Sequence, residues 1–196
     1  MNDSLTYQIE SNHDTSSIHC SLKLRLDENE QLIIGAGYRL SLKTYDRIVQ
    51  NFMEIGFSPP QAITLAKARN LKGREAGSFI NKWLGVYILT KEQELQLFRN
   101  DYQIAEKELE DFIHYNEKRY GALDLAQAPK WVKQILIDFW YTGSMSPAIA
   151  DILFVALKAS IKNHDFSNFE KLMYNSNVWK KHEISLDRMK LRCIYI

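Results

Sequence analysis

The sequence has few of the residues that mark several common protein classes. Cysteine occurs only at Cys20 and Cys193, which is too few for a disulfide scaffold or a four-cysteine zinc site. We expect each to be a small buried hydrophobic residue, and a single bridge between them stays open. With 8 glycines and 4 prolines in 196 residues, the chain also lacks the composition of a collagen, a low-complexity segment or a large all-β protein.

An excess of one charge and long hydrophobic runs are absent as well. Lysine and arginine number 25 and aspartate and glutamate 24, for a net charge of +1. Proteins that grip nucleic acid through its phosphates normally carry a large basic excess, so nucleic acid is not expected as a partner. No apolar run approaches the length of a membrane span, and no basic cap followed by an apolar core marks a signal peptide. Phosphate-binding loops, His-Glu-x-x-His and Gly-x-Ser-x-Gly are missing too, so no metal or other cofactor is expected.

Hydrophobic periodicity predicts a polar arm followed by a β-hairpin. Residues 1–17 are polar apart from a small apolar group, and they indicate an N-terminal arm or a short helix. Apolar and polar residues alternate over 18–26, which is the pattern of a half-buried strand, and a polar turn and a second strand follow. We therefore predict a β-hairpin over residues 18–40, with Gly35 and Gly37 bending its second strand.

The rest of the chain, residues 41–196, has the spacing of helices. Capping boxes predict helix starts at Ser58 and Thr90, and the most apolar stretch, 131–141, is the expected core helix. Further helices are predicted over 45–53, 75–83, 147–163 and 165–174, with an additional candidate over 123–128. The sequence thus predicts one α+β, mainly α domain over 1–196, with a small hairpin and about seven or eight helices.

Three stretches, in this order and spacing, resemble the phage-type lysozyme superfamily, and most of all its pesticin-like toxin branch. The segment from Ile33 to Leu40 resembles the family's Thr-Ile-Gly-x-Gly-x-Asp-Leu, and Leu89 to Glu94 resembles its Leu-Thr-Lys-Glu-Glu-Ala helix start. Residues 131–143 resemble its core helix. The likeness covers residues 18–196 and implies a lysozyme-like fold that cuts bacterial cell walls.

The resemblance also implies two catalytic carboxylates. Glu10 lies twenty-three residues before Ile33, a spacing that fits the general acid of the toxin branch, and it is flanked by Tyr7 and Ile9. Asp27 lies six residues before Ile33 and fits the water-orienting carboxylate of the phage enzymes. The alternatives are a solvated residue of the arm for Glu10 and an ordinary turn residue for Asp27.

Two positions depart from the family pattern. Ile33 stands where the family has a threonine, and isoleucine cannot hydrogen-bond a water molecule. Arg39 stands at the aspartate position of the toxin branch, and a guanidinium facing Glu10 would favour the ionised carboxylate.

Tyr141 would line the cleft and stack on a sugar, or else pack in the core. His13, Asp14 and His19 are nearby in sequence and are candidates to replace the missing group.

Three functional hypotheses follow. The first is a muramidase that cleaves the peptidoglycan glycan strand without a cofactor, as a prophage lysis protein or an antibacterial effector. It would be made in the bacterial cytoplasm, delivered to the periplasm or cell wall by other machinery, and paired with a cognate immunity or delivery protein. The second is a catalytically degenerate module that binds glycan or a protein, and the third is a helical adaptor.

The basic tail from Lys180 to Arg192 is expected to be a solvated helix face, or a patch that attracts an anionic polymer.

Overall fold

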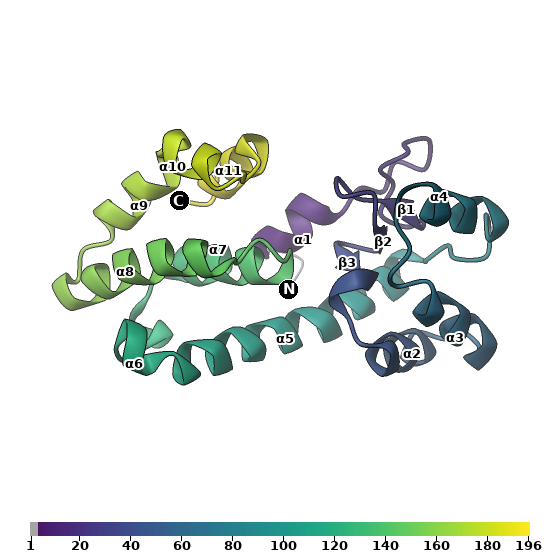
Figure 1. The fold of residues 1–196 in the computed structure, drawn as a ribbon, viewed down its shortest axis with the longest axis horizontal. Coiled ribbons are helices and arrows are strands. Elements are labelled where there is room, and N and C mark those ends of the chain that lie inside the picture. The colour runs from purple at the N-terminus through teal and green to yellow at the C-terminus, as the bar shows by residue number, and fades with distance from the viewer. Residues whose placement is uncertain (1–3) are drawn as a thin grey trace. The chain divides into compact units, whose positions relative to one another are not determined.

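The structure is a computed structural model that describes residues 4–196, and it is mainly helical with a small sheet (Figure 1). The described residues form eleven α-helices, two short 3₁₀ helices and one antiparallel sheet with strand order β1-β2-β3. The strands are β1 (Arg25–Leu26), β2 (Leu32–Ile34) and β3 (Tyr38–Arg39). The helices are α1 (Leu5–Glu10), η1 (Leu40–Leu42), α2 (Tyr45–Glu54), α3 (Pro59–Lys67), α4 (Gly73–Lys82), α5 (Lys91–Tyr115), α6 (Glu117–Tyr120), η2 (Leu125–Gln127), α7 (Lys130–Tyr141), α8 (Pro147–Asn163), α9 (Ser167–Tyr174), α10 (Ser176–Lys181) and α11 (Leu186–Cys193).

The mainly α fold class predicted from the sequence is confirmed. Ten of the eleven α-helices in the described residues follow the hairpin, where seven or eight were predicted, and α6 and α10 among them span only four and six residues. Helices this short show too few turns for hydrophobic periodicity to reveal them. None of the helices in residues 4–196 combines the length and apolar character that crossing a bilayer requires.

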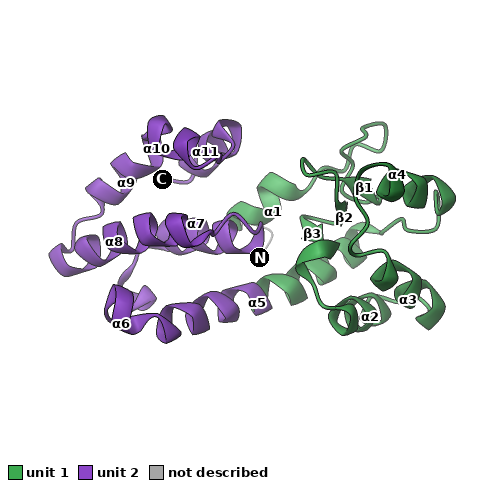
Figure 2. Cartoon of the chain, in the orientation of Figure 1, with its two compact units in different colours: residues 1–103 green, residues 104–196 purple. Residues whose placement is uncertain are grey.

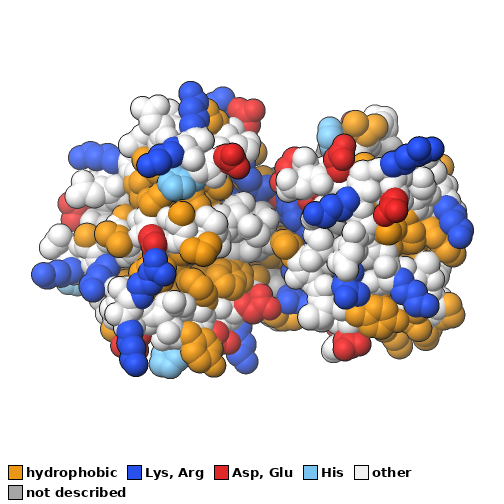
Figure 3. Space-filling model, in the orientation of Figure 1, with side chains coloured by type: hydrophobic (Ala, Val, Ile, Leu, Met, Phe, Trp, Pro, Cys, Tyr) orange, Lys and Arg blue, Asp and Glu red, His pale blue; other side chains and the backbone are white. Residues whose placement is uncertain are grey.

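Contacts divide the chain into two compact units, coloured separately in Figure 2. Unit 1 is Met1–Gln103 and contains the sheet, α1 to α4 and the first half of α5. Unit 2 is Ile104–Ile196 and contains the rest of α5 with α6 to α11. On the face drawn in Figure 3, lysine and arginine side chains are scattered over each unit rather than gathered into one patch.

The predicted hairpin is present, but its first strand is shorter than the alternating pattern indicates. β1 pairs antiparallel with β2 in the register Arg25↔Ile33 and Leu26↔Leu32. Residues before Arg25 leave the hairpin because their backbone groups bond elsewhere: Leu22 accepts from the Leu89 N–H at 2.8 Å. Cys20, Leu22 and Leu24 are buried as the alternation indicates, but Ile18 is 83% exposed and Ser21 is fully buried. The alternation therefore predicts burial only in part, and it predicts strand pairing incorrectly before Arg25.

A bend at Gly35 and Gly37 turns the chain from β2 into β3. Both glycines have positive φ, +63° and +84° respectively, a conformation that side chains disfavour. A Cβ at Gly35 would also lie 3.4 Å from a methyl carbon of Leu97. After the bend, β3 pairs with β2 so that Arg39 lies opposite Ile33. The bend therefore brings a charged side chain next to the hairpin.

Unit 1 has an apolar core built around α2 and α3, and the two helix starts predicted from capping boxes lie in this unit. In α3, the predicted capping box is confirmed, with Pro59 in the first turn. In α5, the Thr90 hydroxyl accepts from the Gln93 N–H at 3.1 Å and the Gln93 side chain accepts from the Thr90 N–H at 2.9 Å. The fully buried side chains here include Leu32, Ile34, Leu40, Phe52, Leu65 and Ala66.

Unit 2 is centred on α7, the predicted core helix, which buries seven of its side chains. One of these is Asp138, whose carboxylate receives Arg192 Nε at 2.8 Å and Arg188 Nη2 at 2.9 Å. Arg192 is itself fully buried, with its guanidinium 3.6 Å from the centre of the Phe139 ring. The expectation of a solvated basic tail is therefore wrong for Arg192 and only partly right for Arg188, since both neutralise a buried carboxylate.

Candidate functional site

Glu10 and Asp27, the two carboxylates singled out in the sequence, meet at one guanidinium in unit 1. Arg39 Nη1 lies 3.4 Å from Glu10 Oε1, and Arg39 Nε lies 3.4 Å from Asp27 Oδ2. Arg39 Nη2 lies 3.4 Å from Glu28 Oε1, but the Glu28 side chain is 71% exposed. The bend after β2 thus brings the side chain of β3 between the end of α1 and the β1–β2 turn.

Glu10 occupies the last position of α1 and is shielded from solvent. The helix starts at Ser4, whose hydroxyl accepts from the Tyr7 N–H, and it ends when Ser11 takes extended backbone angles. Only 7% of the Glu10 side chain is exposed. Glu10 is therefore not a solvated residue of a loose arm, because it is a sheltered carboxylate with a cationic neighbour.

Asp27 is engaged in holding the turn as well as in facing Arg39. Its Oδ1 accepts from the backbone N–H groups of Asn29 and Gln31, each at 2.9 Å. Its side chain is 1% exposed, and Oδ2 has no hydrogen bond beyond the long ionic contact with Arg39. Asp27 is therefore a turn residue, as the alternative predicted, and its second oxygen faces Arg39.

Ile33 brings no polar group to this cluster. It is buried in β2 and supplies only an apolar surface opposite Arg39. Tyr141, the other predicted binding residue, is buried near the end of α7, in unit 2.

A second polar group in unit 1 is formed by Glu94, His13 and Tyr7. Glu94 lies in the first turn of α5 and is completely buried. Its Oε2 is 2.5 Å from His13 Nε2 and accepts from the Tyr7 hydroxyl at 3.2 Å, whereas its Oε1 has no hydrogen bond. Burial, followed by the charge of Glu94, raises the pKa of Tyr7 to about 12, so the hydroxyl stays a donor.

Arg25 links the two groups electrostatically. Its guanidinium nitrogens donate to the Gly35 carbonyl at 3.3 and 3.4 Å, next to the bend. Burial is the main cause that lowers the pKa of Arg25, while Glu10 and Glu94 oppose this shift and Arg39 adds to it. Glu10, Arg39 and Glu94 therefore all act on one sheltered cation, and the two groups form one polar cluster.

Sequence reasoning found part of this cluster and missed the rest. It identified Glu10, Asp27 and Arg39, and it listed His13 as a substitute, but it assigned no role to Arg25 or Glu94. Glu94 was part of a helix-start motif, where an acidic residue is ordinary. An acidic residue that follows a capping box yet falls on the apolar side of the helix is the signal that would have identified it.

The other candidates from the sequence do not join the cluster. Asp14 bonds locally, accepting from the Ser16 N–H at 3.0 Å, and His19 is exposed. Both cysteines are free, with Cys20 buried as expected and Cys193 half-buried, so the bridge left open is not formed. Within residues 4–196, no group of three or more His, Cys, Asp or Glu side chains is placed to hold a metal ion.

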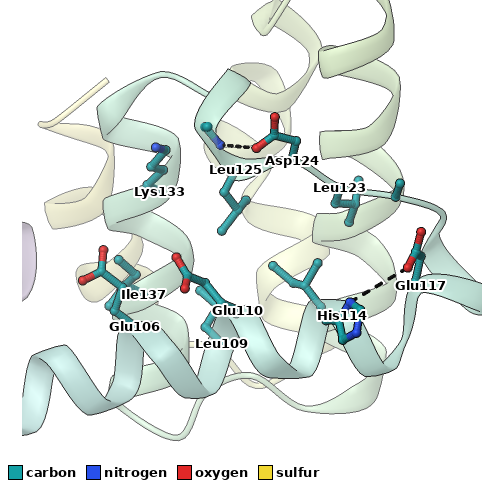
Figure 4. A pocket seen from close by; sticks show the side chains of 13 residues that line it. Glu106, Leu109, Glu110, His114, Glu117, Leu123, Asp124, Leu125, Lys133 and Ile137 are labelled. Atoms are coloured by element: carbon teal, nitrogen blue, oxygen red, sulfur yellow. Dashed lines mark hydrogen bonds and ion pairs between the residues drawn. The ribbon is translucent and has the colours of Figure 1, made fainter.

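Unit 2 contains a separate open cavity of about 450 Å³. It lies between α5, the segment around η2, and α7, with Leu109, Leu125 and Ile137 among its apolar lining (Figure 4). Of its acidic residues, Asp124 is engaged as the cap of η2, accepting from the Ala126 N–H at 2.8 Å. No site residue predicted from the sequence lines this cavity.

The chain matches the model of a known protein family. The model of a family described as Domain of unknown function (DUF8812) matches residues 3–193. No curated protein and no solved structure matches the chain.

Proposed function

Because the chain belongs to the DUF8812 domain family, whose description assigns no activity, we propose its function from the site: it is a lysozyme-like hydrolase of the peptidoglycan glycan strand. Glu10 is its general acid. The observation that carries the proposal is the meeting of Glu10 and Asp27 at Arg39, although the two carboxylates come from different elements. Glycosidic cleavage needs a sheltered carboxyl group that holds a proton and a group that activates water.

The sheltered position of Glu10 supports that role. Only 7% of the Glu10 side chain and 1% of the Asp27 side chain are exposed, and both face the guanidinium of Arg39. A general acid of a glycosidase needs such a sheltered position beside the leaving oxygen. A carboxylate at Asp27 would stabilise the positive charge that develops on the sugar in the transition state.

A second function, binding of glycan without cleavage, is favoured by a different observation. Ile33 is buried and apolar where the lysozyme resemblance implies a hydroxyl group, and Asp27 is committed to backbone groups of its turn. A site with these two features would bind a sugar strand but would lack a group to position the attacking water.

An assay with purified peptidoglycan separates the two functions. Wild type, Glu10→Gln and Glu28→Gln would be incubated with peptidoglycan, and new reducing ends would be measured. Glu28→Gln is the matched control, because Glu28 contacts the same guanidinium but is exposed. We expect Glu10→Gln to lose activity by about 100-fold or more and Glu28→Gln to keep it.

The other outcomes are equally decisive. If wild type makes no product but sediments with cell walls, the binding function replaces the hydrolase. If wild type neither cleaves nor sediments, both proposals are wrong. Circular dichroism of each variant would show that a loss of activity is not a loss of fold.

A further inference from the structure

The pair formed by His13 and Glu94 is not used by the acid just described. Glu94 is fully buried, yet it is paired with a histidine whose side chain is 31% exposed. A buried carboxylate behind a solvent-accessible imidazole is the arrangement by which proteins orient a histidine for proton transfer.

The contact with Glu94 determines which nitrogen of His13 is available. A carboxylate accepts hydrogen bonds and does not donate them, so Nε2, at 2.5 Å from Glu94 Oε2, carries the hydrogen. In the neutral ring, Nδ1 then has a free lone pair. The Tyr7 hydroxyl, bound to the same carboxylate oxygen at 3.2 Å, helps to hold Glu94 in place.

His13 also lies close to Glu10 along the chain, three residues further on. Three residues of extended chain span at most about 11 Å, so the backbones of Glu10 and His13 are no further apart than that. Inverting glycosidases keep their acid and base about 6.5–9.5 Å apart, which leaves room for a water molecule. Glu10 and Glu94 also share an electrostatic neighbour, the half-buried Arg25.

Asp27 is less suited to act as the base. One of its oxygens is bound to two backbone N–H groups and the other faces Arg39, and its side chain is 1% exposed. His13 has one ring nitrogen held by Glu94, and its side chain is 31% exposed, compared with 7% for Glu10 and 1% for Asp27. His13 is therefore better suited than Asp27 to accept a proton from water.

We infer that His13 is the base that takes a proton from the attacking water, and that Glu94 is the positioning residue behind it. This inference rests on the hydrolase function proposed above. Glu10 donates its proton to the leaving glycosidic oxygen as the bond to the anomeric carbon breaks. The water oxygen bonds to that carbon from the opposite side and gives its proton to His13 Nδ1, so the sugar product has inverted configuration. Solvent then returns a proton to Glu10 and removes one from His13.

The test uses the same peptidoglycan assay with three variants. His13→Ala should lower kcat by about 100-fold or more, and added imidazole should restore part of the lost rate. Glu94→Gln keeps an acceptor for His13 but loses the charge, and it should lower kcat by about 10–100-fold with KM unchanged. His19→Ala is the control, because His19 lies on the same segment and is exposed.

Each outcome bears on one of the two proposals. Full activity in His13→Ala overturns this assignment while the hydrolase function stands. A loss of activity that imidazole does not restore also overturns it, because the residue would then be structural. A wild type that makes no product overturns the hydrolase function, and the assignment of His13 falls with it.

Discussion

Replacing Arg39 by methionine tests the electrostatic description of the carboxylate cluster. Methionine keeps a long apolar side chain but removes the cation that Glu10 and Asp27 share at 3.4 Å each. Both carboxylates are more than nine-tenths buried, and removing one partner of a buried ion pair costs about 3–5 kcal/mol. The exposed contact with Glu28 contributes about 0–1 kcal/mol.

The expected loss is large compared with the whole stability of a domain, about 5–15 kcal/mol. Urea unfolding of wild type, Arg39→Met and Glu28→Gln would measure it, with Glu28→Gln expected within about 1 kcal/mol of wild type. A loss of stability below about 1 kcal/mol in Arg39→Met would refute the reasoning.

Two further predictions concern stability away from the cluster. Asp138→Ala strands the buried Arg192 and should cost about 3–5 kcal/mol in urea unfolding, so a cost near zero would contradict the ion-pair description. Burial alone would raise the pKa of Asp138, but Arg192 and Arg188 outweigh burial and lower that pKa. The ion pairs of Asp138 therefore stabilise the fold fully above the unfolded pKa of about 3.9, and this stabilisation is lost as the pH falls through the lowered folded pKa. Acid titration of wild type followed by circular dichroism would show this loss. Gly35→Ala forces a side chain into φ +63° and against Leu97, and should lower the thermal midpoint by several degrees, whereas an unchanged midpoint would refute the strain.

The helices could be predicted from the sequence because their signals are local. Two helix starts follow from the capping pairs Ser58–Gln61 and Thr90–Gln93, and each pair spans only four residues of sequence. The apolar stripe of α7 spans three turns and is visible in the sequence alone. The first strand was overestimated because Leu22 bonds to Leu89, sixty-seven positions away, and no local pattern reports such a partner.

The candidate site was predicted in part for the same reason. Spacing to Ile33 was enough to select Glu10 and Asp27, and the register across the glycine bend then brings Arg39 to both. The contact between His13 and Glu94 joins residues 81 positions apart. It depends on how α5 packs against α1, which alternation and capping do not encode.

The ion pairs of α7 have a consequence for synthesis of the chain. The guanidiniums that neutralise Asp138 belong to residues 50 and 54 positions further on, in α11. Until α11 has left the ribosome, α7 holds a buried carboxylate without these two counter-ions. The second unit therefore completes its folding only after Arg192 has been synthesised, and a chain truncated before Arg188 would leave that carboxylate unneutralised.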